Sequence, residues 1–173
     1  MTVLVVILGF VVVVLVAMLV ARSDLRLSRP KAGARRILVP FTGGTLDQTV
    51  LAAAIRIAQA QEATLVPAYL LRVPLQYPED SPFASEVEVA LPLLEAVEHA
   101  ALRGGVPVDA RIEKGRTPTH ALRRLWEVEH FDWIVAPASA TGGGGGFTTK
   151  EVAWILDHSP SETVLLKPAP TTV

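Results

Sequence analysis

The segment from 131 to 168 constrains the fold most, because it contains four structural signals in a fixed order. An apolar run at 132–136 is followed by five consecutive glycines at 142–146, and a second apolar run closes the segment. Between the glycines and that run, apolar residues at 151–158 have helical spacing, whereas the two apolar runs show no alternation, as in fully buried strands. The segment therefore predicts a strand, a glycine loop, a helix and a strand.

The predicted loop precedes a helix N-terminus, which is the place where α/β folds bind anions. Backbone N–H groups and the positive end of the helix dipole point there. Thr148 or Thr149 can cap the helix and donate a hydroxyl, and Lys150 adds a cation. A second interpretation stays open, because five glycines are also typical of a flexible loop whose ordering would cost conformational entropy.

The rest of the chain from Arg36 onward alternates between strand and helix patterns. We expect strands at 35–41, 63–71, 106–114, 132–136 and 163–168. Asp47 and Thr117 are predicted N-caps of the first and third helices, and the second helix is expected to end at Gly104. This alternation predicts a five-stranded parallel sheet with helices on both faces.

The ligand crevice of such a sheet lies beyond the carboxyl ends of the strands, at the switch point of the strand order. Gly43 and Gly44 follow the first strand, and the glycine loop follows the fourth strand. We therefore expect two glycine turns to meet at one crevice.

Four residues give finer expectations. Pro67 predicts an irregular or exposed part of the second strand, because proline cannot donate to a strand ladder. Pro92 either kinks the second helix or marks its true start. Leu91 and Leu102 are expected in the core with the other apolar residues of that helix.

Residues 2–21 contain no charged side chain. At 1.5 Å per residue they would form a helix of roughly 30 Å, the thickness of a bilayer core, so we predict a transmembrane helix at 1–21. A cleaved signal peptide is the alternative, but the sequence shows no clear basic n-region or small-x-small cleavage site.

A basic flank follows the apolar segment and predicts its orientation. Between Arg22 and Arg36 six basic residues stand against Asp24, so the positive-inside rule places the N-terminus outside. We expect a single-pass protein of a prokaryotic plasma (inner) membrane, with a cytoplasmic α/β domain at 36–173. The basic juxtamembrane linker at 22–35 can contact anionic membrane lipid.

Composition and spacing exclude several functions. From Ile37 onward there are 10 basic and 16 acidic residues, a formal net charge of −6, which is a poor basis for binding nucleic acid. The chain has no cysteine, and no two of its four histidines have i, i+4 spacing, so we predict no metal site. A nucleophile elbow is also absent, and we predict no enzyme activity.

Four stretches in sequence order resemble the universal stress protein (UspA-like) family. They are "ILVPFTGG", "EKGRTPTHAL", "FDWIVAP" and "ILDHSPSETVLLKP". The resemblance implies a flavodoxin-like (Rossmann-like) parallel sheet, a homodimer, and in one branch of the family ATP binding. That branch has an aspartate after the first strand and a G-x2-G-x9-G-[ST] loop after the fourth. Here Thr42 stands at the aspartate position, and Pro137 and Ala140 stand near the first two loop glycines.

The candidate site for a nucleotide or another anion consists of residues that follow the strand ends. They are Thr42, Gly43, Gly44, Val73, Gly142, Gly143, Gly144, Gly145, Gly146, Thr148, Thr149 and Lys150. Two functions stay open: a membrane-tethered regulatory or sensory domain that binds ATP or another adenine nucleotide, and a ligand-free accessory subunit of a larger membrane complex. No cofactor is required by the residues themselves.

Overall fold

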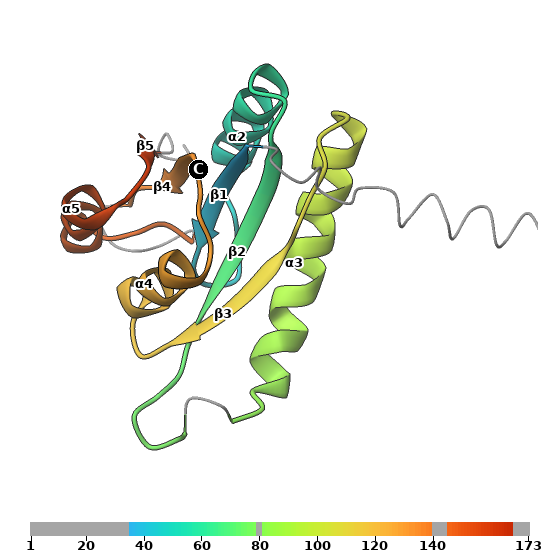
Figure 1. The fold of residues 1–173 in the computed structure, drawn as a ribbon. Helices are drawn as coiled ribbons and strands as arrows, with labels where there is room; N and C mark the ends of the chain where they lie inside the picture. The colour runs from blue at the N-terminus through green and yellow to red at the C-terminus, as the bar shows by residue number, and fades with distance from the viewer. Residues whose placement is uncertain (1–34, 79–80, 140–144, 168–173) are drawn as a thin grey trace, which may run out of the picture.

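The computed structural model describes residues 35–78, 81–139 and 145–167. Its elements are β1 (Arg36–Phe41), α2 (Gln48–Ala60), β2 (Thr64–Arg72), α3 (Ala84–Arg103), β3 (Arg111–Gly115), α4 (Pro118–Val128), β4 (Trp133–Pro137), α5 (Thr149–His158) and β5 (Glu162–Leu166). The five strands form one parallel sheet in the order β3-β2-β1-β4-β5, as Figure 1 shows. The predicted five-stranded parallel sheet is confirmed.

No helix within these described ranges is long and apolar enough to cross a membrane. The predicted transmembrane helix at 1–21 and nearly all of the predicted linker lie outside them.

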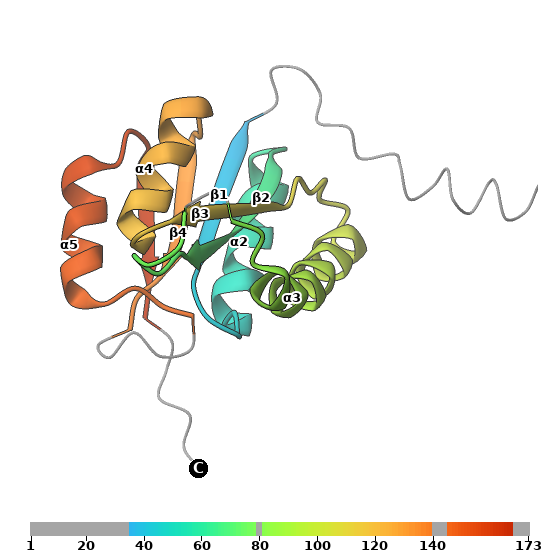
Figure 2. The ribbon, with the colours of Figure 1, turned by 90° about the horizontal axis from the view of Figure 1, so that it is seen from below.

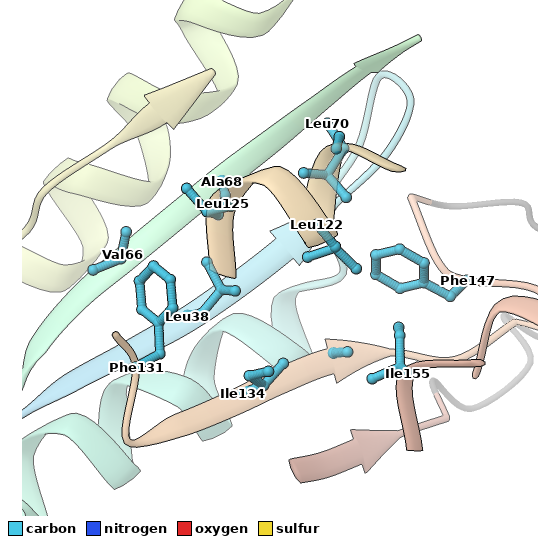
Figure 3. Close-up of a cluster of buried hydrophobic side chains, with 12 residues drawn as sticks. Leu38, Val66, Ala68, Leu70, Leu122, Leu125, Phe131, Ile134, Phe147 and Ile155 are labelled. Atoms are coloured by element: carbon cyan, nitrogen blue, oxygen red, sulfur yellow. The ribbon is translucent and has the colours of Figure 1, made fainter. Parts of the chain in front are cut away.

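The helices cover the sheet in two pairs, with α2 and α3 on one face and α4 and α5 on the other (Figure 2). Strand residues alternate between the two cores because successive side chains point to opposite faces. In β1, Leu38 packs in the cluster under α4 and α5, whereas Ile37 and Val39 pack under α2 and α3. Figure 3 shows the first cluster, in which Phe131 and Phe147 are fully buried.

Pro67 lies in a regular, buried part of β2, which corrects the expectation of an irregular or exposed segment. The reason is the side toward which its nitrogen points. Leu65 exchanges both backbone hydrogen bonds with the chain before β3, because its N–H donates to Pro107 and its carbonyl accepts from Asp109, each at 2.9 Å. Two residues later the nitrogen of Pro67 points to the same side, where β3 has not yet begun. The missing N–H therefore breaks no ladder bond.

The predicted strand at 106–114 is shorter in the structure, since β3 begins at Arg111 and the preceding residues form only an isolated bridge at Val108. Pro92 lies inside α3, which starts at Ala84, so it does not mark the helix start.

Two expectations about the α3 core are wrong. Leu91 is 47% exposed and Leu102 is 38% exposed, whereas Leu94, Val97 and Ala101 are buried as expected. Leu156 on α5, which shares the helical spacing of its apolar face, is also 58% exposed. These three leucines lie on sides of α3 and α5 that no described element covers.

The amino edge of the sheet is closed by a ring of four charged side chains, which we call the ion-pair ring. Arg36 at the start of β1 contacts Asp109 at 2.9 Å and Glu129 at 2.6 Å. Arg111 contacts the same two carboxylates, at 2.9 and 3.1 Å. The ring connects β1 to the start of β3 and the end of α4.

Candidate functional site

The two glycine turns meet at the carboxyl edge of the sheet, as predicted. β1 and β4 are neighbours whose connections leave toward opposite faces, which makes this position the switch point. The Thr42 N–H donates to the Gly145 carbonyl at 3.1 Å. Gly145 is buried with a φ of +76°, and a Cβ atom there would lie 2.0 Å from the Thr45 carbonyl oxygen and 2.8 Å from that of Thr42. Only glycine permits so close an approach.

The downstream end of the glycine loop is anchored to the end of β4. Phe147 donates its N–H to Pro137 and accepts one from Ser139, both at 2.8 Å. Its ring is fully buried in the core under α4 and α5 (Figure 3). The backbone of 145–147 is therefore fixed on both sides, by the β1 turn and by this core. Residues Gly142, Gly143 and Gly144 of the predicted site lie outside the described residues.

The N-terminus of α5 forms a capping box. The Thr148 hydroxyl accepts the Glu151 N–H at 3.4 Å, and the Glu151 carboxylate accepts both the N–H and the hydroxyl of Thr148 at 2.8 Å. Of the two predicted candidates, Thr148 is thus the cap and Thr149 is not, and the Thr148 hydroxyl already donates within the chain. The Glu151 carboxylate places a negative charge at the positive end of the helix dipole.

Thr149 and Lys150 form the exposed start of α5, next to this capping box. Gly43 and Gly44 are exposed in the β1–α2 turn, and a Cβ atom on either would meet nothing within 4 Å. Exposed residues thus lie on both sides of the Gly145 contact.

Val73 is placed differently from the other predicted site residues. It is buried at the end of β2 in a cluster with Phe41 and Tyr69, and its N–H donates to Gly115 at 2.9 Å. Burial, with a smaller contribution from Glu86, raises the pKa of the Tyr69 hydroxyl above its ordinary value. Val73 therefore contributes core packing, and its backbone donor is already used.

The loop after β2 borders this edge and is bound to β3 by two cations. The Arg116 guanidinium donates to the carbonyls of Pro74 at 2.6 Å and Tyr77 at 2.9 Å. Lys114 donates to the Ser81 carbonyl at 2.8 Å. These bonds hold the loop at the ends of β2 and β3.

Three residues of the site were not predicted. Glu151 could have been found, because Thr148-Thr149-Lys150-Glu151 has the T-x-x-E spacing of a capping box. Thr45 and Phe147 contribute through a close backbone approach and through long-range packing, and neither leaves a local signal in the sequence.

The fold and the switch-point contact define an α/β domain with a doubly wound parallel sheet and two glycine turns at its carboxyl edge. The model of the universal stress protein family matches residues 33–167. The chain belongs to the universal stress protein family.

Several solved structures have a similar fold. A universal stress protein family member from Burkholderia pseudomallei is 20% identical with a TM-score of 0.55, and the match covers 81% of this chain and all of that one. A universal stress protein in complex with cAMP is also 20% identical, with a TM-score of 0.57, and the match covers 78% of this chain and 98% of that one. One from Archaeoglobus fulgidus in complex with dAMP is 11% identical with a TM-score of 0.54, at 76% and 96% coverage. No curated protein matches the chain.

Proposed function

We propose that the chain is a membrane-tethered regulatory domain that binds an adenine nucleotide at the carboxyl edge of the sheet. The observation that carries this proposal is the contact between Gly145 and the Thr42–Thr45 turn, which brings two glycine turns together at the switch point. Family members with this fold are known in complex with cAMP and dAMP, which supports an adenine nucleotide as the ligand.

The phosphates of the nucleotide would lie at the exposed start of α5, where Lys150 supplies a positive charge. Glu151 already occupies part of the helix N-terminus, so the ligand must either displace its carboxylate from Thr148 or bind beside it. Thr42 offers a hydroxyl where the resemblance implies a carboxylate, so recognition of the base rests on neutral hydrogen bonds. We therefore expect binding weaker than in family members with the aspartate.

The test is calorimetric titration of ATP, ADP, AMP and cAMP into residues 31–173, after mass spectrometry has checked for nucleotide carried through purification. The structure from Burkholderia pseudomallei is matched over its whole length, so this fragment is expected to fold alone. Micromolar binding supports the proposal. Lys150→Ala should weaken it roughly tenfold to hundredfold, since a hydrogen bond to a charged group contributes about 1.5–3 kcal/mol. Arg56→Ala, which removes an exposed cation from α2, is the matched control.

A second function, the ligand-free accessory subunit, is favoured by one observation. Several backbone donors near the strand ends are already satisfied within the chain, since Thr42 donates to Gly145, Val73 to Gly115 and Thr148 to Glu151. If no nucleotide binds and none is carried through purification, this second function replaces the first, and partners should be sought among membrane proteins that co-purify with the full chain.

The tether is proposed from the sequence of residues 1–21 and from the basic residues that follow it. Because the chain has no cysteine, single cysteines introduced at Thr2 and at Lys167 report separately on the two ends. In intact cells a membrane-impermeant maleimide should label position 2 and not position 167. Labelling of both positions only after lysis would contradict an outside N-terminus.

A further inference from the structure

An apolar groove of about 500 Å³ lies between α2 and α3, on the face of the sheet opposite α4 and α5. Leu51 and Ile55 line it from α2, and Leu93 lines it from α3. All three side chains are only half buried. Val89, one helical turn before Leu93, is 53% exposed. Among the described residues, none covers these side chains.

The chain enters the described part of the structure near the C-terminal end of α2. The Arg35 guanidinium donates to the side chain of Gln61, the C-cap residue of α2. The Gln59 side chain donates to the Gly104 carbonyl at 2.8 Å, which places the C-terminal end of α3 beside that of α2. Arg103, the last residue of α3, also lines the groove. Arg35, the first described residue, therefore lies near the C-terminal ends of α2 and α3, on the side of the groove that Arg103 lines.

The linker is long enough to reach the apolar part of the groove. At roughly 3.3 Å per extended residue, residues 27–34 can span about 26 Å. From Gln61 back to Leu51, α2 covers only about 15 Å at its rise of 1.5 Å per residue. Leu25 and Leu27, the two leucines of the linker, can therefore lie against Leu51 and Ile55.

The charges of the linker and of α3 are complementary. The linker carries Arg22, Arg26, Arg29 and Lys31 against a single acidic residue, Asp24. α3 carries Glu86, Glu88, Glu95 and Glu98 against a single arginine, Arg103. Glu88 and Glu95 are exposed. Glu95 and Glu98 are the sequence neighbours of Ala96 and Val97, which line the groove, so an apolar pair of side chains flanked by cations matches an apolar groove along an acidic helix.

We propose that residues 22–31 of this chain bind along the α2–α3 groove, with Leu25 and Leu27 in the groove and the basic residues at the glutamates of α3. The bound linker keeps the α2–α3 face and the amino edge of the sheet close to residue 21, where the apolar segment 2–21 ends. Anionic lipid headgroups compete for the same basic residues, so the domain is held closely in a neutral membrane and released in an anionic one.

The test is disulfide cross-linking in the full chain, reconstituted into phosphatidylcholine nanodiscs. No native cysteine interferes. Leu27→Cys is combined either with Ala96→Cys, an exposed position that lines the groove, or with Val128→Cys, which is 81% exposed on α4. Val128 is a matched control because it also lies near the linker: the next residue, Glu129, contacts Arg36 at 2.6 Å.

We expect roughly tenfold more intramolecular disulfide with Ala96→Cys than with Val128→Cys, which corresponds to about 1.4 kcal/mol of docking preference. Adding Glu88→Lys and Glu95→Lys should reduce the groove cross-link to the control level, and phosphatidylserine in the nanodisc should lower it as well. Equal yields for the two pairs would overturn the proposal. Cross-links found only between two chains would also overturn it, because the groove would then receive a second copy.

Discussion

Replacing Gly145 by alanine tests whether the close approach of the two turns builds the site. A residue with a Cβ atom in the left-handed region costs roughly 1–2 kcal/mol. At Gly145 the added atom would also lie 2.0 Å from the Thr45 carbonyl oxygen, so the backbone must shift. Forced shifts of this kind cost about 1–3 kcal/mol. Together the two effects predict a loss of about 2–5 kcal/mol in the free energy of unfolding.

Gly43→Ala is the matched control. Its φ of +71° is close to the +76° of Gly145, but a Cβ atom there meets nothing within 4 Å. The control should therefore lose only the conformational part, roughly 1–2 kcal/mol. Replacing glycine by alanine also lowers the conformational entropy of the unfolded chain. This effect is the same in both variants, so it cancels in the difference between their free energies of unfolding.

The assay is urea denaturation of residues 31–173, followed by calorimetric titration of the same variants with AMP. We expect Gly145→Ala to unfold at lower urea than Gly43→Ala and to lose nucleotide binding. Equal stabilities of the two variants would refute the reasoning, because the contact with Thr45 would then have no energetic consequence.

Three further predictions concern other parts of the domain. Thr148→Ala should cost about 1 kcal/mol in thermal or urea unfolding by removing the cap of α5, and Thr148→Ser should restore most of it. Burial, opposed by Arg124 and assisted by Glu129, raises the pKa of Glu113 above its ordinary value of 4.5. The folded state then holds its proton to higher pH than the unfolded state, so wild-type stability relative to Glu113→Gln should fall as the pH rises above 4.5. A relative gain measured by urea midpoints at pH 4.5 and 7 would contradict this sign. Leu156→Glu should abolish a homodimer built on the edge strand β5, as measured by light scattering after gel filtration, whereas Val128→Glu on α4 should not. A monomeric wild-type fragment would exclude that dimer.

The features that could be predicted from the sequence are those whose causes are local. Asp47 caps α2, with its carboxylate accepting N–H groups at 2.8 and 3.2 Å, and Thr117 caps α4. Both have a polar side chain directly before an amphipathic run, which is a short-range pattern. The alternation of strands and helices predicted the parallel sheet but not its strand order, and the observed order β3-β2-β1-β4-β5 differs from the flavodoxin order that the resemblance implied. The position of each glycine turn at the carboxyl end of a parallel strand sufficed to predict that the two turns would meet, without identifying Gly145 as the residue in contact.

The expectations that failed depend on neighbours distant in sequence. Whether Pro67 interrupts a strand depends on where β3 begins, and no local pattern contains that information. Leu91 and Leu102 fit the helical period as well as Leu94 does, but only Leu94 is buried. Which leucine the sheet covers depends on where α3 lies across the sheet, and the period does not contain that information. The packing of the two turns likewise depends on residues about a hundred positions apart in the chain. The sequence therefore predicts that the turns meet, but it does not predict which hydrogen bonds they form.

The ion-pair ring and the position of β1 have a mechanical consequence. β1 follows the linker directly and lies between β2 and β4, paired with both. Tension applied through the linker while the opposite end of the domain is held would load these two ladders in shear, so many hydrogen bonds must yield together rather than one after another. Arg36 is the first residue of β1 and would bear the load first, and its two carboxylate contacts would add to the resistance. A load applied through the linker would thus reach the domain at a central strand, whereas a load applied through the edge strand β5 would break the hydrogen bonds of one ladder in succession.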